Sequence, residues 1–163
     1  DIIMIWLVAF IIVLPFSLVL FFGAPYLPTR QRQALQAIKL LNLKKGELLV
    51  DLGCGDGAVL IQAAKLGIRG IGYEINPYIY IIAKIRTWKY RKFVTIKMKN
   101  FWDETIPPET KGVFVFLLDK YMERLNLKLT RDLKPKTRLV SYSFEIPNKK
   151  IHKTVNEMHL YIY

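Results

Sequence analysis

Cysteine and histidine are scarce in this chain of 163 residues. There is one cysteine, Cys54, and there are two histidines, His152 and His159. A single cysteine excludes an intramolecular disulfide and suits a reducing compartment. The two histidines lack the spacing of metal ligands, and neither lies near Cys54 in sequence. We therefore expect no metal site and no cysteine nucleophile, and we expect both histidines at the surface or in a strand.

Charged residues are absent between Ile2 and Thr29. Residues 2–22 are almost wholly aliphatic or aromatic, and a helix of that length spans roughly 30 Å, the thickness of a bilayer core. We therefore predict a transmembrane helix, with residues 1–25 as a membrane anchor. A cleaved signal peptide and a buried core helix are the alternatives. A signal peptide would have a basic flank, whereas the charge that precedes this run is Asp1.

Basic residues follow the apolar segment directly. They are Arg30, Arg32, Lys39, Lys44 and Lys45. Because membrane proteins keep such residues on the cytoplasmic side, we expect residues 26–163 to form one domain in the cytoplasm. A chain of this length allows one ordinary domain plus a short appendage.

Acidic residues are also few. The chain has 13 of them against 25 basic residues, which gives a net charge of +12 at pH 7. Basic side chains cluster between Lys84 and Lys99, where they alternate with apolar residues. Such a face suits anionic lipid headgroups, and it would attract nucleic acid equally well. A basic face that is merely solvated is the third interpretation.

Past Tyr26, the chain contains an alternation of helical and strand patterns without an internal repeat. The expected helices follow Thr29, cover 58–66, start at Pro77, lie around Pro107 and cover 120–133. The expected strands cover 48–52, 68–74, 92–98, 112–118, 137–144 and 159–163, and the last of them is expected to close the sheet. In the helix that starts at Pro77, the residues expected to face inward are Ile81, Ile82, Ile85 and Trp88. This alternation predicts an α/β fold with a Rossmann-like, doubly wound, mostly parallel sheet.

The segment "DLGCGDG", residues 51–57, lies where the first strand turns into its helix. Ligands of open α/β sheets bind at this carboxyl end of the strands. Its glycines let the backbone turn sharply and approach a ligand closely. Glu74 ends the second strand, 21 residues beyond Gly53, which is the distance at which an acid bonds ribose hydroxyls. The turn is therefore predicted to hold a nucleotide.

The choice of nucleotide depends on Asp51. Gly53, Gly55 and Ala58 also satisfy the relaxed dinucleotide pattern G-x-G-x-x-A. However, a carboxylate at position 51 would crowd a pyrophosphate, whereas it would pair well with an ammonium group. S-adenosylmethionine has an adenosine, a cationic sulfonium and an amino acid end, and it has no phosphate. We therefore expect S-adenosylmethionine as the cofactor.

The same residues resemble a known family. "DLGCGDG" together with "GYEINP" resembles class I, seven-strand S-adenosylmethionine-dependent methyltransferases. Four further stretches, "YLPT", "GYEINPYIYIIAKIRTWKY", "NFW" and "SFEIPN", are similar to the small membrane-anchored protein-lysine methyltransferases. These are related to the enzymes that modify the adenine nucleotide translocase and the ATP synthase c subunit. The resemblance covers nearly the whole chain, and it implies a prokaryotic membrane enzyme whose partner is a membrane-associated protein substrate.

The resemblance also implies roles for individual residues. At the methionine end and the ribose of the cofactor, it places Tyr26, Thr29, Asp51, Gly53, Cys54, Gly55, Gly57, Glu74 and Asn76. Asn100 stands where the family usually has an aspartate that bonds the adenine amino group, and Phe101 and Trp102 would flank the adenine. Core packing is the alternative for these two aromatic residues, and a helix cap is the alternative for Thr29.

For catalysis, we expect three residues, two after the fourth strand and one at the end of the fifth, which lies in the matching "SFEIPN" stretch. Asp119 and Tyr121 would position a neutral lysine amine, and Phe144 would line its channel. Three rival functions remain open. They are methylation of RNA or DNA, methylation of a membrane lipid or quinone, and non-catalytic dinucleotide binding. Adenine-modifying members usually show "N/D-P-P-Y" after the fourth strand, whereas this chain has "LLDKYM" there.

Overall fold

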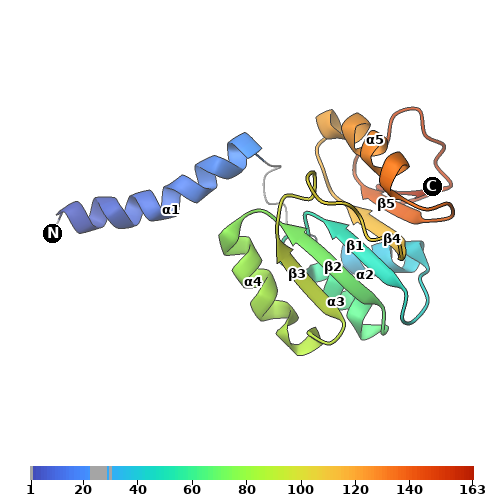
Figure 1. Cartoon of the computed structure of the whole chain (residues 1–163), viewed down its shortest axis with the longest axis horizontal. Coiled ribbons are helices and arrows are strands. Elements are labelled where there is room, and N and C mark those ends of the chain that lie inside the picture. Colours follow the sequence, from blue (N-terminus) through green and yellow to red (C-terminus); the bar gives the residue numbers. More distant parts are fainter. Residues whose placement is uncertain (1, 23–28, 30) are drawn as a thin grey trace.

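The computed structural model describes the backbone of residues 2–22, 29 and 31–163, and in the first helix it describes the side chains of residues 2–11 and 13. That helix, α1 (Ile2–Phe22), extends away from the rest of the chain (Figure 1). Within this description, no helix is long and apolar enough to cross a membrane. The predicted helix is therefore present, but its predicted transmembrane character is not supported. The boundary predicted between residues 25 and 26 falls outside the described residues.

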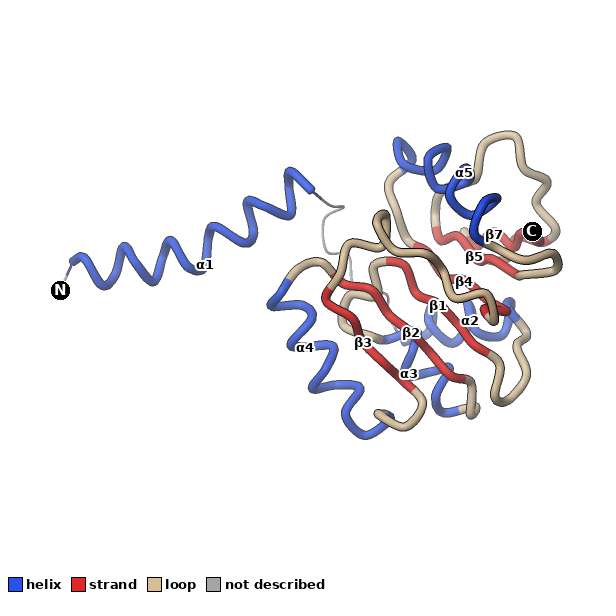
Figure 2. Tube along the Cα trace, viewed as in Figure 1, coloured by secondary structure: helices blue, strands red, loops and turns tan. Residues whose placement is uncertain are grey.

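Within the described residues, seven strands form one sheet in the order β3-β2-β1-β4-β5-β7-β6 (Figure 2). Their bounds are β1 Leu48–Leu52, β2 Arg69–Glu74, β3 Val94–Met98, β4 Thr110–Val115, β5 Arg138–Tyr142, β6 Lys153–Val155 and β7 Met158–Ile162. Strands β1 to β5 pair in parallel, and β7 pairs antiparallel with both β5 and β6. All five residues of β1 are buried, as its continuous apolar run predicts. The predicted α/β class with a mostly parallel sheet is confirmed.

Helices cover both faces of this sheet. Their bounds are α2 Gln31–Leu41, α3 Ala58–Lys65, α4 Pro77–Thr87 and α5 Met122–Asp132, with short 3-10 helices η1 (Trp88–Tyr90) and η2 (Asp119–Tyr121). Buried residues of α2, α3 and α4 form one core cluster with the strands. Residues of α5 form the other cluster with the opposite face of the sheet, together with Phe101, Ile106 and Ile146. The sheet is thus doubly wound, and its core lies in two layers.

Three details of the predicted order of elements are wrong. No helix forms around Pro107, where residues 101–109 form turns and extended chain. Pro108 keeps the residue before it out of the helical region, and the amide of Thr110 bonds the carbonyl of Pro107 at 3.0 Å as β4 begins. The short strand β6 was not predicted. The last predicted strand, seen as β7, does not close the sheet, because it lies between β5 and β6.

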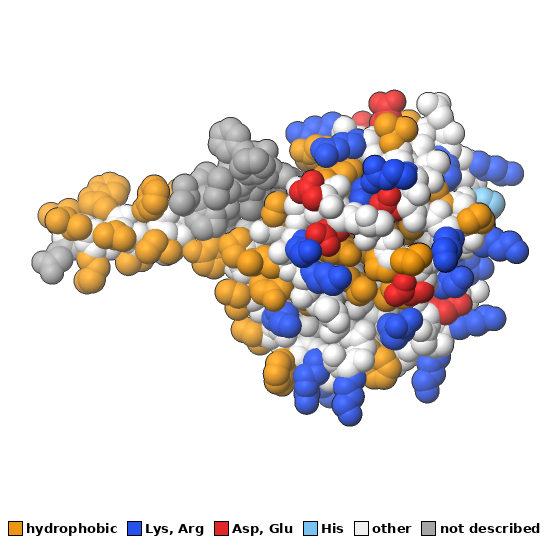
Figure 3. All heavy atoms as spheres, viewed as in Figure 1, with side chains coloured by type: hydrophobic (Ala, Val, Ile, Leu, Met, Phe, Trp, Pro, Cys, Tyr) orange, Lys and Arg blue, Asp and Glu red, His pale blue; other side chains and the backbone are white. Residues whose placement is uncertain are grey.

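The orientation predicted for α4 is also wrong. Ile81, Ile82, Ile85 and Trp88 were expected to face inward, yet they are 53%, 44%, 70% and 63% exposed. The buried side of α4 consists instead of Ile79, Ala83 and Thr87. Of these, Ala83 and Thr87 face Gly57, and their small size lets α4 lie close to the turn before α3. Figure 3 shows the resulting hydrophobic surface, interspersed with Lys and Arg side chains.

Candidate functional site

The turn from β1 into α3, residues 53–57, is tied to the end of the neighbouring strand β2. The amides of Gly53 and Cys54 both donate to the carbonyl of Tyr73, at 3.0 Å and 2.8 Å. The amide of Gly57 then donates to the carbonyl of Cys54 at 2.9 Å, which closes the turn. The turn therefore sits at the carboxyl ends of two adjacent parallel strands, where ligands of such sheets bind.

Two glycines in this turn serve different purposes. Gly53 and Gly57 have φ angles of +85° and +80°, which side-chain-bearing residues rarely adopt. A Cβ atom on Gly57 would lie 2.8 Å from Cγ2 of Thr87, so the absent side chain allows α4 to pack against the turn. A Cβ atom on Gly53 would meet nothing within 4 Å. The space beside Gly53 is therefore left free, as a ligand that approaches the backbone requires.

Glu74 lies at the end of β2 and faces this turn. Its Oε2 accepts a hydrogen bond from the amide of Gly55 at 3.1 Å, and its Oε1 accepts one from the amide of Asn76 at 2.8 Å. Burial raises the pKa of Glu74, although these backbone hydrogen bonds oppose the increase. The structure thus brings Glu74 to the glycine turn as the spacing predicted. Its two oxygens hold the turn and also leave lone pairs for a ligand.

Asp51 is the buried acid of the site. Its side chain lies in β1 and is 2% exposed, and none of the ion pairs within the described residues includes it. Burial raises its pKa well above the usual range, and the charge of Glu74 adds to the increase. Two neighbouring carboxyl groups without a cation favour a ligand that brings a positive charge. An ammonium group fits this pair, and a pyrophosphate does not.

Asn76 and Cys54 contribute to the shape of the site. The Oδ1 of Asn76 accepts from the amides of Tyr78 and Ile79, at 2.9 Å and 3.2 Å, and so caps α4. Cys54 is buried, and a Cβ on Gly72 would lie 2.6 Å from its Sγ. Burial, with the charges of Asp51 and Glu74, raises the pKa of the Cys54 thiol well above its usual range. The thiol therefore stays protonated at neutral pH, as a non-nucleophilic residue would.

Asp56 connects the turn with two helices, a role that the sequence did not reveal. Its Oδ1 accepts a hydrogen bond from the amide of Ala58 at 3.1 Å, and its other oxygen pairs with Arg86 of α4. The contact holds the start of α3 against α4. The available signal was an aspartate two residues before the predicted helix, because Asp side chains commonly accept a hydrogen bond from the backbone amide two residues on.

The loop after β3 supplies an aromatic wall. Asn100 accepts from the amide of Trp102 at 3.2 Å through its Oδ1, which fixes the loop. The rings of Phe101 and Trp102 lie 4.6 Å apart, and Trp102 lies 6.3 Å from Tyr121. Phe101 is buried in the core, whereas Trp102 is partly exposed with Arg124 over its ring at 4.2 Å. The structure therefore brings together Trp102, a predicted cofactor residue, and Tyr121, a predicted catalytic residue.

The remaining candidates lie outside the glycine turn in sequence. Tyr121 and Phe144 both pack partly buried against the core cluster that includes α5, and Asp119 is exposed at the start of η2. Thr29 is partly buried before α2, and Tyr26 lies outside the described residues. The roles of these residues stay predictions.

Three further residues lie at the same end of the sheet as Asp51. The rings of Phe116, just after β4, and Tyr142, at the end of β5, are 4.7 Å apart. The Nε2 of Gln33 in α2 donates to the hydroxyl of Tyr142 at 3.0 Å. The Oε1 of Gln33 is buried without a hydrogen-bond partner among the residues that the structure describes. Aromatic residues at the carboxyl ends of two strands were the signal that could have identified this group.

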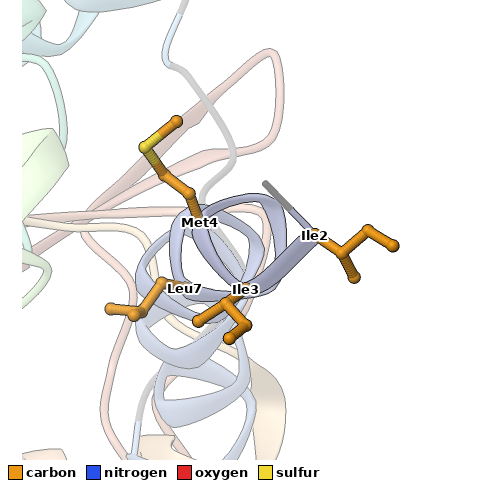
Figure 4. Close-up of a pocket in the computed structure, with 4 residues that line it drawn as sticks. All are labelled: Ile2, Ile3, Met4 and Leu7. Atoms are coloured by element: carbon orange, nitrogen blue, oxygen red, sulfur yellow. The ribbon is translucent and has the colours of Figure 1, made fainter.

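A surface hollow on α1 is not part of this site. Figure 4 shows the side chains that line it, which are those of Ile2, Ile3, Met4 and Leu7. It has no polar side chain to orient a ligand and lies on the helix that extends away from the sheet. We therefore place the candidate site at the glycine turn, where Asp51 and Glu74 lie beside the open space at Gly53.

Comparisons with known proteins identify relatives of this chain. Residues 51–153 match the ANTKMT methyltransferase domain family. The lysine N-methyltransferase of the ATP synthase c subunit from Homo sapiens is 31% identical over 126 residues, which cover 76% of this chain and 53% of that protein. A protein-lysine N-methyltransferase of Saccharolobus islandicus is 35% identical, and the match covers 75% of this chain and 78% of that protein. The chain thus spans about half the length of the human relative.

A solved structure shares the fold over most of its length. It is the RNA methyltransferase from Salinibacter ruber in complex with S-adenosyl-L-homocysteine, with a TM-score of 0.76 and 25% sequence identity. The match covers 84% of this chain and 92% of that one.

Proposed function

Because the chain belongs to the ANTKMT methyltransferase domain family, we propose that it transfers methyl groups from S-adenosylmethionine to lysine side chains of proteins. The choice of S-adenosylmethionine as the cofactor is supported by one observation, the acids Asp51 and Glu74 beside the open space at Gly53. The proposal of lysine as the acceptor is supported by relatives that are named protein-lysine N-methyltransferases.

The residues of the site fit this cofactor. Asp51 would pair with the ammonium group of its methionine end, and Glu74 would accept hydrogen bonds from the ribose. The space beside Gly53 admits the ligand against the backbone, and Trp102 would flank the adenine. When bound, S-adenosylmethionine supplies a methyl group on a cationic sulfonium, from which the sulfur leaves readily.

The chain must then present a neutral lysine amine in line with that methyl group. The new bond joins the amine nitrogen to the methyl carbon as the carbon–sulfur bond breaks, and the nitrogen afterwards loses a proton. Proximity and orientation can supply several kcal/mol of the barrier. Among the predicted candidates, Asp119 and Tyr121 would orient the amine and Phe144 would exclude water.

Phe116 and Tyr142 offer a second wall for the lysine on the face of the sheet that carries Asp51. Aromatic rings there would desolvate the amine and so favour its uncharged form. The unpaired Oε1 of Gln33, among the described residues, could accept a hydrogen bond from the amine N–H. We include these three residues in the proposed acceptor site.

We also propose that α1 attaches the enzyme to a membrane, with the domain on the cytoplasmic side. The segment between Ile2 and Thr29 carries no charge, the apolar side chains of its first turns are exposed, and basic residues follow it. The substrate would then be a protein close to the bilayer. Protease protection in sealed vesicles of known orientation tests the arrangement, and digestion of the domain from the outer side would contradict it.

The reaction is tested by incubating membranes with radiolabelled S-adenosylmethionine and the full chain. We expect label on lysines of a few proteins, seen by mass spectrometry as one or more added methyl groups. Asp51→Ala should abolish the labelling, because it removes the partner of the ammonium group. Label in RNA or in the lipid extract, with lysines unmodified, would refute lysine as the acceptor. Label in RNA would instead favour the activity named for the Salinibacter ruber protein.

A further inference from the structure

The outer face of α4 is apolar although it does not face the core. The residues at helical spacing on this face are Tyr78, Ile81, Ile82 and Ile85, and Trp88 continues it into η1. All five side chains are exposed. Monomeric soluble domains rarely expose such a continuous apolar stripe without a binding partner. We name these five residues the α4 face.

Positive charge surrounds the α4 face. The exposed cations are Lys84, Arg86, Lys89, Arg91 and Lys92, and the sequence has no acidic residue between 77 and 99. Arg86 is paired with Asp56, and the guanidinium of Arg91 lies 4.9 Å from the centre of the Trp88 ring. Lys84, Lys89 and Lys92 form no ion pair within the described residues. They are therefore available for an anionic partner.

Apolar residues flanked by lysines, with a tryptophan at one end, are typical of a helix that lies in a membrane interface. The α4 face is also continuous with the apolar helix α1, since the hydroxyl of Tyr78 donates to the carbonyl of Ile11 at 2.7 Å. Figure 3 shows the hydrophobic surfaces of these two parts next to each other. We propose that the α4 face docks on the surface of an anionic lipid bilayer.

Docking of α4 would orient the active site with respect to the membrane. The helix begins at Pro77, directly after Glu74 and the Asn76 cap, so its first turn adjoins the cofactor turn. A lipid surface held against α4 therefore fixes the distance of the cofactor site from the headgroups. This role is independent of the reaction that the site performs.

The test labels two exposed aliphatic positions of the full chain with an environment-sensitive fluorophore. Ile85 on α4 is 70% exposed, and Leu127 on α5 is 71% exposed, which makes Leu127→Cys a matched control for Ile85→Cys. The native Cys54 is buried, so unmodified protein serves as the labelling blank. The proteins are reconstituted in phosphatidylcholine vesicles with and without phosphatidylglycerol, and brominated acyl chains serve as the quencher.

We expect the label at position 85 to shift to shorter wavelength and to be quenched in the anionic vesicles, and we expect neither change at position 127. Because lysines attract anionic headgroups, changing Lys84, Lys89 and Lys92 to Gln should abolish the effect at position 85. The same change at Lys134, Lys150 and Lys153, which are also exposed, should preserve it.

Three results would overturn the proposal. The first is a label at position 85 that remains unquenched in anionic vesicles. The second is equal quenching at both positions, which would indicate adhesion without orientation. The third is a blue shift at position 85 that depends on protein concentration and not on lipid, because this would identify a second copy of the chain as the occupant.

Discussion

Substitution of the two turn glycines by alanine should separate stability from cofactor binding. Gly53 and Gly57 share nearly the same φ, so each alanine has a backbone cost of about 1–2 kcal/mol. The new Cβ at Gly57 also meets Thr87 Cγ2 at 2.8 Å, and Thr87 is itself buried. Overpacking of this kind adds about 1–3 kcal/mol. We therefore expect Gly57→Ala to lower the free energy of unfolding by about 2–5 kcal/mol, and Gly53→Ala by about 1–2 kcal/mol.

The order should reverse for cofactor affinity. A Cβ at Gly53 projects into the open space where the ligand would contact the backbone, whereas one at Gly57 points to α4. A steric cost of about 1–3 kcal/mol in the bound state corresponds to a loss of affinity of roughly five- to 150-fold for Gly53→Ala. Urea denaturation measures the stabilities, and calorimetric titration with S-adenosylhomocysteine measures the affinities.

Thr87→Ser supplies the control for the steric argument. It removes Cγ2 and keeps the hydroxyl, which donates to the carbonyl of Ala83 at 2.7 Å. Added to Gly57→Ala, it should recover part of the lost stability, and a double-mutant cycle measures that coupling. The reasoning is refuted if Gly53→Ala binds S-adenosylhomocysteine like the unmodified protein. It is equally refuted if the two alanine variants are destabilised by the same amount.

Two further predictions concern buried charges. Because burial and then Glu74 raise the pKa of Asp51, this carboxyl destabilises the ligand-free fold as pH rises through its folded-state pKa. Asp51→Asn should therefore raise the free energy of unfolding of the ligand-free protein at neutral pH and make that free energy less dependent on pH, as measured by urea denaturation. Calorimetry of the same variant should detect no binding of S-adenosylhomocysteine. An unchanged free energy of unfolding would contradict the prediction. Lys128 and Asp132 form an ion pair with side chains 5% and 3% exposed. Because Asp132 keeps its hydrogen bond from Arg131, Lys128→Ala should cost about 1.5–3 kcal/mol in thermal or urea unfolding, whereas the double change of Lys128→Met with Asp132→Asn should restore much of it. Burial alone would raise the pKa of Asp132, but hydrogen bonds from Arg131 and Lys128 lower it. The stability that this pair contributes should therefore be lost as pH falls through that lowered pKa. A free energy of unfolding that stays constant over the acidic range would refute this prediction.

The geometry of the proposed cofactor site could be predicted from sequence because it depends on local spacing. Asp51, the glycine turn and Glu74 belong to two successive strands, and parallel pairing of β1 with β2 brings their ends together. The geometry of the proposed acceptor site could not be predicted in the same way. The hydrogen bond between Gln33 and Tyr142 joins residues that are 109 positions apart in the chain, so no short sequence pattern predicts it.

The reversed face of α4 has a similar explanation. Its sequence offers two apolar stripes, and periodicity alone does not say which of them meets the sheet. The orientation follows from the close approach of Thr87 and Ala83 to Gly57, which leaves no room for a larger side chain at either position. Strand β6 was missed because its three residues, Lys153–Val155, are exposed or partly exposed and show no apolar run.

The position of β7 has a consequence for biosynthesis. Strand β5 ends at Tyr142, but the strand that covers its second edge, β7, comes later at Met158–Ile162. Translation at roughly 5–20 residues per second leaves that edge unpaired for about 1–4 seconds in each new chain. Leu139, Val140 and Ser141 of β5 are all buried in the finished sheet, and an unpaired apolar edge can pair with another chain. The nascent protein therefore passes through an interval of aggregation risk just before its sheet is complete, when a chaperone would have most effect on its yield.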